Sequence, residues 1–298
     1  MEFNKKILSN GLSVIGEVNK SAKSTAVGFF VKTGSRDETA EINGVSHFLE
    51  HMVFKGTEKL SALEVNEAFD RTGAQFNAFT NEENTVFYAA VLPEYLMEVA
   101  DLWSQLMRPS LREDDFNMEK NVIKEEIAMY QDLPHFDVMD TCKNLYFEDH
   151  PCANSVLGTV ESIDGLTADQ MKEYFSRRYA PNNMTLAVAG NFEWEQICDL
   201  AEKNCGGWEN RQISRTLEDY DGSEQVKRET KKNLSREHIC LISPSVSSQD
   251  SRRYAAKLFS NIVGDLVGSR YFWELIDTAI AQSASMQFAD MDGTGVFY

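Results

Sequence analysis

The sequence of 298 residues has no long hydrophobic run. Its longest apolar stretch, Ala26 to Val31, has about six residues, whereas a membrane-spanning helix needs roughly 18. The first residues, Met1 to Lys6, lack the apolar core of a signal peptide and the Arg-rich, Ser-rich character of a transit peptide. We therefore expect a cytoplasmic protein that does not insert into a membrane.

Positive charge is also scarce. The chain has 29 Lys and Arg residues against 47 Asp and Glu, which gives a formal net charge of −18 at pH 7. This surplus argues against nucleic acid and against an anionic membrane surface as partners, because both carry negative charge themselves. A well solvated surface explains such a surplus, and a preference for basic peptides is the alternative.

Cysteine is present without a disulfide pattern. The five cysteines are an odd number and contain no C-x-x-C pair, so we expect free thiols in a reducing compartment. Cys198, Cys205, His238 and Cys240 could be combined into a zinc site. Their spacing matches no common zinc module, which favours buried structural cysteines instead.

Strand and helix patterns are mixed along the chain. The expected strands are residues 3–8, 12–18, 24–32, 74–80, 84–91, 184–190 and 237–242, and residues 295–298 resemble the middle of another. The expected helices are residues 43–54, 61–71, 93–106, 112–131, 136–147, 167–178, 193–204, 249–266 and 269–278. Because hairpin turns such as Asn10-Gly11 imply antiparallel pairing, we predict the α+β class rather than a doubly wound α/β fold.

A polar segment divides the chain into two domains. Turn and charged residues dominate the region before residue 234, which predicts a domain at 1–210, a linker at 211–233 and a second domain at 234–298. The second domain has about 65 residues and ends within a strand pattern. We therefore expect this second half to be truncated.

The segment His47-Phe48-Leu49-Glu50-His51 is the strongest functional signal. On a helix, residues three and four apart share one face, so His47, Glu50 and His51 are expected to point the same way. Two imidazoles one turn apart can hold zinc, and the carboxylate beside them can take a proton from a zinc-bound water. This H-x-x-E-H order is the inverted form of H-E-x-x-H. Two surface histidines and an acid that share a face by chance are the alternative.

A zinc site that activates water needs a third protein ligand, and the helix at 112–131 offers candidates. Its expected apolar face consists of Phe116, Met118, Val122, Ile123, Ile127, Met129 and Tyr130. Glu119 and Glu126 fall in the middle of this face, and Glu125 falls at its edge. Because a buried acid is costly without a compensating charge or metal, we assign Glu126 as a ligand. Glu119 either supports the ligands or acts as a catalytic acid; alternatively, both acids reach water along a half-buried face.

These residues resemble the inverted-zincin peptidases, the family of pitrilysin, insulysin and the mitochondrial processing peptidase, and most of all its bacterial two-domain members. The resemblance covers nearly all of residues 1–200. It is carried by the motif at 47–51, by Asn43-Gly44-Val45-Ser46, Met52-Val53-Phe54-Lys55-Gly56-Thr57 and Gly73-Ala74-Gln75-Phe76-Asn77-Ala78-Phe79-Thr80, by Glu83 and Thr85, and by Tyr179-Ala180-Pro181-Asn182-Asn183-Met184.

The resemblance implies two similar α/β-layered halves that close as a clamshell on unfolded peptides. It implies one Zn²⁺ per chain, held by His47, His51 and Glu126, with Glu50 as the base of a zinc metalloendopeptidase. A catalytically silent scaffold or partner subunit is the alternative function, and a structural zinc site is a third. The complete set of Glu50 and three ligands favours the enzyme, because a silent subunit has no need of Glu50.

The resemblance also suggests where a substrate binds. Asn77, Ala78 and Phe79 would form an edge strand to which the peptide adds as a further strand, and Glu83 is a candidate contact nearby. In the second half, where family members carry a Gly-Leu-Ala-Tyr segment, this chain has Gln282 near the tyrosine position. The expected partners are peptides, with no nucleic acid and no membrane, and a homodimer is left open.

Overall fold

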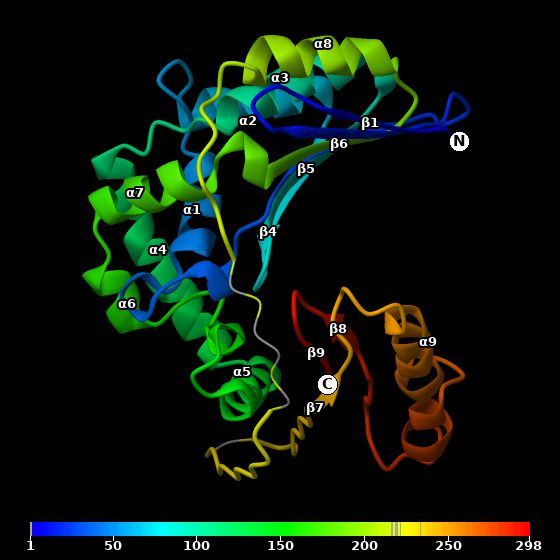
Figure 1. Cartoon of the computed structure of the whole chain (residues 1–298). Helices are drawn as coiled ribbons and strands as arrows, with labels where there is room; N and C mark the ends of the chain where they lie inside the picture. The colour runs from blue at the N-terminus through cyan, green and yellow to red at the C-terminus, as the bar shows by residue number, and fades with distance from the viewer. Residues whose placement is uncertain (1, 216, 218–219, 221, 233) are drawn as a thin grey trace. The chain divides into compact units, whose positions relative to one another are not determined.

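The computed structural model describes residues 2–215, 217, 220, 222–232 and 234–298 (Figure 1). Their contacts divide the chain into two compact units. The first unit consists of Met1–Ala128 and Asn154–Ser214, and the second of Met129–Ala153 and Arg215–Tyr298. Over the described residues, no helix combines the length and the apolar character needed to cross a membrane.

A six-stranded sheet is the framework of the first unit, in the order β1-β2-β6-β3-β5-β4. Its strands are β1 (Glu2–Ile7), β2 (Ser13–Val18), β3 (Thr25–Val31), β4 (Gln75–Thr80), β5 (Thr85–Val91) and β6 (Met184–Gly190). Four of the five neighbouring pairs are antiparallel, as the hairpin signals predict, whereas β2 and β6 run parallel. Local turn signals cannot predict that pair, because three other strands and several helices lie between its two strands in the sequence.

Seven helices are described in the sequence of the first unit, one of which, α4, ends in the second. They are α1 (Val45–Val53), α2 (Ala62–Thr72), α3 (Leu96–Leu106), α4 (Glu113–Gln131), α6 (Val160–Gly165), α7 (Ala168–Arg178) and α8 (Trp194–Cys205). Helices α3 and α8 cover one face of the sheet (Figure 1). This mixture of helices with a mainly antiparallel sheet confirms the α+β class.

The core of the first unit lies between the sheet and its helices. In β3, Val27, Phe29 and Val31 are buried, whereas Phe30 is exposed on the opposite face. Trp103 of α3 is also fully buried in this core. Burial of one such apolar side chain stabilises the fold by about 1.5–3 kcal/mol relative to its exposure.

The ends of α2 follow from local sequence. The Ser61 hydroxyl accepts a hydrogen bond from the Glu64 amide, and the Glu64 carboxylate accepts one from the Ser61 amide, which forms a capping box. Gly73 then takes the left-handed conformation with φ of 64°, which a residue without a side chain adopts at little cost. The helix expected at 61–71 is thus confirmed within one residue at each end.

The second unit has its own small sheet and core. Its elements are α5 (Pro134–Phe147), α9 (Arg253–Gly264), β7 (Ser243–Ser245), β8 (Phe288–Asp290) and β9 (Gly295–Phe297), and the strand order is β7-β9-β8. The core consists of Tyr146, Phe147, Cys152, Ala153, Met291 and Val296. Residues 129–153 therefore group with the second unit, although the sequence places them within a domain at 1–210. The domain boundaries at 210 and 234 stay a prediction.

The structure differs from two expectations for the second half. Residues 237–242 do not form a strand, and the first strand of this unit is β7. Ile239 and Leu241 are exposed there, and the segment pairs with none of the described strands. The helix expected at 269–278 contains a π-helical turn at Phe272–Ile276. Within the expected linker, the described residues of 211–232 form neither helix nor strand, and 216, 218, 219, 221 and 233 lie outside the described residues.

Candidate metal centre

Helix α1 begins at a point fixed by a buried carboxylate. Gly44 has φ of 92° immediately before the helix. The Glu38 carboxylate accepts hydrogen bonds from the backbone amides of Gly44 and Ser46, each at 2.7 Å, and from the side-chain amide of Asn43 at 2.9 Å. These contacts satisfy amides that the helix itself leaves without a partner. The first turn of α1, which leads into His47, is therefore held firmly.

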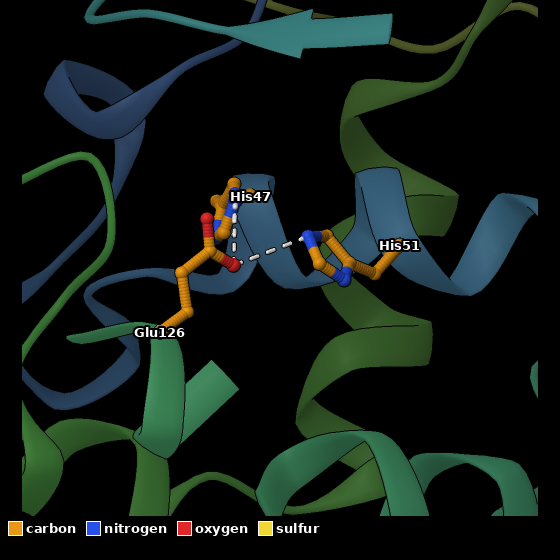
Figure 2. Close-up of side chains that lie close together, drawn as sticks. All are labelled: His47, His51 and Glu126. Carbon is orange, nitrogen blue, oxygen red and sulfur yellow. Dashed lines mark ion pairs between the residues drawn. The ribbon is translucent and has the colours of Figure 1, made fainter. Parts of the chain in front are cut away.

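The three proposed ligands come together from two helices (Figure 2). Nε2 of His51 lies 3.5 Å from Oε2 of Glu126, and Nε2 of His47 lies 3.8 Å from the same oxygen. One nitrogen or oxygen atom from each of the three residues lies within 4.8 Å of the others, and among the described residues this is the cluster that could hold a metal ion. Helix α1 supplies both histidines one turn apart, and α4 supplies the acid.

The geometry suits a small tetrahedral ion. Zinc bonds of about 2.0–2.2 Å place neighbouring ligand atoms about 3.3–3.6 Å apart, close to the two distances observed. His47 is buried, and its Nδ1 has no hydrogen-bond partner among the described residues. Burial, with a smaller effect from His51, lowers the pKa of His47 to about 3. The ring is therefore neutral at physiological pH, which is the form that binds metals.

Glu119 lies behind His51 rather than beside the ligand atoms. Its Oε1 is 2.8 Å from Nδ1 of His51, and its Oε2 forms an ion pair with Nζ of Lys55 at 2.5 Å. Burial acts to raise the pKa of Glu119, but the hydrogen bond from His51 and the neighbouring Lys55 outweigh it, and the pKa is lowered. An ionised Glu119 holds the proton of His51 on Nδ1 and leaves Nε2 free to bind a metal. This contact supports the first of the two roles considered for Glu119.

Glu50 completes the functional face of α1. Its carboxylate is buried, and Oε2 accepts a hydrogen bond of 2.6 Å from Oγ1 of Thr80 in β4. Burial raises the pKa of Glu50 above its ordinary value, although the Thr80 hydrogen bond and His51 act in the opposite direction. A carboxylate with a raised pKa is suited to accept a proton near neutral pH.

The buried face of α4 is narrower than the sequence suggests. Its buried residues are Phe116, Glu119, Ile123 and Ile127. Met118, Val122 and Met129 were expected on the same face but are 65%, 46% and 53% exposed. Glu126 is partly buried at the rim of this face, whereas Glu125 is exposed, so the helix register distinguishes the two adjacent acids as expected.

The candidate substrate residues lie on and after the outermost strand. Asn77, Ala78 and Phe79 belong to β4, which is an edge of the six-stranded sheet, as predicted. Phe79 lines an apolar groove on the open face of the sheet together with Phe30 and Tyr88.

Glu83 lies in the turn between β4 and β5 and contacts a residue of another segment. It forms an ion pair with Arg36, whose side chain is 1% exposed. This pair ties the turn to the segment before α1.

Three residues that contact the start of α1, Glu119 or Glu50 were not predicted from the sequence: Glu38, Lys55 and Thr80. Lys55 is four residues after His51, and α1 spacing could have suggested a shared face. Strand alternation could have placed Thr80 opposite Phe79, on the side of β4 toward α1. Glu38 precedes α1 by several residues, and no local period connects it with the helix.

Comparison with known families agrees with this geometry. A family profile described as Insulinase (Peptidase family M16) matches residues 13–160, and one described as Peptidase M16 inactive domain matches residues 165–298. Both histidines of α1, Glu50 and the acids of α4 lie within the first of these matches.

Proteins with similar sequences are named zinc proteases. The protein named uncharacterized zinc protease YmxG, from Bacillus subtilis, is 35% identical over 290 residues, which are 96% of this chain and 70% of that protein. Uncharacterized zinc protease SCO5738, from Streptomyces coelicolor, is 34% identical over 280 residues, which are 90% of this chain and 60% of that protein. The chain thus spans 60 to 70% of the length of these two relatives.

Solved structures share the fold. A protease from Helicobacter pylori aligns with a TM-score of 0.85 at 23% identity and covers 99% of this chain and 73% of that one. A peptidase M16 inactive domain from Pseudomonas fluorescens aligns with a TM-score of 0.81 at 15% identity and covers 100% of this chain and 73% of that one. At such identities the likeness concerns the fold alone.

Proposed function

The chain belongs to peptidase family M16, the insulinase family, and from this premise we propose that it is a zinc-dependent metalloendopeptidase that hydrolyses unfolded peptides. The observation that carries the proposal is the convergence of His47, His51 and Glu126, with the buried carboxylate of Glu50 on the same helix. The two relatives are named zinc proteases, and these names support zinc as the metal.

Three side chains would hold one Zn²⁺ per chain. His47 and His51 would each offer Nε2, and Glu126 a carboxylate oxygen. Bound there, zinc would polarise the scissile carbonyl and make a water molecule more acidic. Glu119 keeps the ring of His51 in the correct orientation and tautomer for this task.

Glu50 carries the proton in the reaction. Its ionised carboxylate takes a proton from the attacking water and then delivers it to the nitrogen of the departing amine, which closes the proton balance of peptide hydrolysis. Its raised pKa favours the uptake of that proton, because it makes the carboxylate a stronger base. A hydrogen bond from Thr80 occupies one of its oxygens and leaves the other for this exchange.

The peptide would bind along β4. An edge strand offers main-chain donors and acceptors to an added strand, so affinity does not depend on one particular sequence. Asn77 and Ala78 lie in this strand, and Phe79 extends the contact into the apolar groove on the open face of the sheet. The acidic composition supports peptides over nucleic acid as partners. A cytoplasmic location and a homodimer stay predictions.

An assay of peptide cleavage separates the enzyme from a catalytically silent relative. We expect the wild type to cleave an unfolded fluorogenic peptide, to lose activity with a chelator and to regain it with added zinc. A protein that binds zinc and the peptide without cleaving it would support the silent scaffold instead.

A further inference from the structure

The hydroxyl of Thr80 makes a short contact with Glu50. Oγ1 of Thr80 lies 2.6 Å from Oε2 of Glu50, within the range of about 2.5–2.7 Å that is typical of a hydroxyl bound to an ionised carboxylate. A second hydroxyl, Oγ1 of Thr85, lies 3.4 Å from that of Thr80 and itself donates to the carbonyl of Thr33 at 3.0 Å. Thr80 has a single hydroxyl proton, and the contact with Glu50 is much shorter than the one with Thr85, so this proton is directed to Glu50.

The sheet holds this hydroxyl in place. Thr80 is the last residue of β4 and pairs with Thr85, the first residue of β5. Thr85 is fully buried. Along β4 the exposed residues alternate with partly buried ones, and Thr80 is one of the partly buried set, on the side that contacts α1. The pairing fixes the backbone of Thr80, and its β-branched side chain has few rotamers.

Beside two histidines, Glu50 could act either as a metal ligand or as a proton acceptor. A carboxylate is a common zinc ligand, and three protein ligands with an open position suit catalysis, whereas a fourth protein ligand makes a closed, structural site. In the part of the chain that the structure describes, the converging ligand atoms belong to His47, His51 and Glu126 and not to Glu50. One oxygen of Glu50 is instead held by Thr80.

We propose that Thr80 is a positioning residue that keeps Glu50 out of the metal coordination and so preserves it as the proton acceptor. This inference rests on the proposed zinc peptidase function. It also links two parts of the reaction, because the strand that would bind the peptide is the strand that orients the base. The peptide bond and the carboxylate would thus be aligned by one rigid element.

Thr80→Val tests this inference, since valine has nearly the shape of threonine without its hydroxyl. Zinc affinity is measured by chelator competition, and coordination by the visible spectrum of the cobalt-substituted protein. We expect Thr80→Val to bind zinc at least about tenfold more tightly as Glu50 joins the ligands, and its kcat to fall roughly 100-fold with little change in KM. Thr80→Ser, which keeps the hydroxyl, should restore both values.

Two controls make the result specific. Thr72→Val removes a buried hydroxyl that bonds to the Phe69 carbonyl, away from the metal centre, and should change neither affinity nor kcat. Glu50→Gln introduced into Thr80→Val should abolish the gain in zinc affinity, because the amide is a poor ligand. If Thr80→Val does not fold, Thr80→Ala replaces it in the same measurements.

The outcomes separate this inference from the function on which it rests. Wild-type zinc affinity and an unchanged cobalt spectrum in the hydroxyl-free variants would overturn the inference, even if kcat falls. A folded wild type that binds no zinc would overturn the proposed function, and the inference with it. Tighter zinc binding that persists after Glu50→Gln would also overturn the inference, because Glu50 would not be the added ligand.

Discussion

Glu119 accepts a hydrogen bond of 2.8 Å from Nδ1 of His51, and the opposite nitrogen of that ring faces Glu126 at 3.5 Å. The two acids of α4 thus act on the same imidazole from its two sides. One acid sets the proton, and the other shares the proposed metal. This division of labour follows from their separation by seven residues, which places both on one side of the helix.

We predict that Glu119→Gln keeps one zinc per chain but weakens its binding by about 10-fold to 100-fold. The amide can still contact the ring but no longer carries the charge that favours a proton on Nδ1. Titration of zinc against a chelator measures the effect. Binding equal to that of the wild type would show that Glu119 does not support His51.

Substitutions of the adjacent acids Glu125 and Glu126 should differ in their effect on zinc affinity. Glu126→Gln removes a proposed ligand and should lower zinc affinity by more than about 100-fold, whereas Glu125→Gln changes an exposed residue and should leave affinity within twofold. The same chelator titration decides the matter, with Glu125→Gln as the matched control. Equal losses would mean that the register of α4 differs from the one described.

Because the buried acid Glu38 has a raised pKa, we predict that the free energy of unfolding depends on pH. Burial raises its pKa from 4.5 to about 7, although hydrogen bonds from Ser46, Gly44 and Asn43 act against this. A folded-state pKa above the unfolded value means that folding binds a proton. The resulting stability is present in full below about pH 4.5 and is lost as the pH rises through about 7.

Denaturant unfolding of metal-free protein between pH 4.5 and 8 measures this effect. The free energy of unfolding of the wild type, relative to that of Glu38→Gln, should fall by up to about 3 kcal/mol over this range. Glu41→Gln changes an exposed acid of the same segment and should show the wild-type pH dependence. A constant difference between wild type and Glu38→Gln would contradict the assignment.

Substitution of Glu83 should lower the stability of the fold and should not weaken peptide binding. Glu83→Gln removes the carboxylate of Glu83 from the buried guanidinium of Arg36 and should lower the free energy of unfolding by about 3 kcal/mol. KM for the peptide should stay within twofold. Glu67→Gln, on the exposed side of α2, should change neither quantity. A raised KM with unchanged stability would restore Glu83 as a substrate-binding residue.

Sequence periodicity was sufficient to predict which candidate site residues share one face of a single helix. The spacing of His47, Glu50 and His51 predicts one face of α1, and that of Glu119 and Glu126 predicts one side of α4. The structure brings these two faces together. The same register favours Glu126 over Glu125 as the proposed ligand, because Glu125 is exposed.

The contacts made between distant segments could not be predicted in this way. Thr80 reaches Glu50 from a strand, and Glu38 reaches the start of α1 from a loop, so neither pair shares a helical period. The parallel pairing of β2 and β6 likewise depends on the path of the chain between them. Local apolar alternation at 237–242 was misleading because a strand also needs a partner and a face to bury.

The most direct test of the account is zinc content and peptide cleavage measured on the same samples of wild type, Glu50→Gln and His47→Ala. We predict about one zinc per chain in the wild type, the same content without cleavage in Glu50→Gln, and loss of both in His47→Ala. Glutamine preserves the shape of Glu50 but cannot accept the proton. Loss of zinc from Glu50→Gln as complete as that from His47→Ala, or cleavage by Glu50→Gln at the wild-type rate, would contradict the assignment of Glu50 as base beside a His47, His51 and Glu126 metal site.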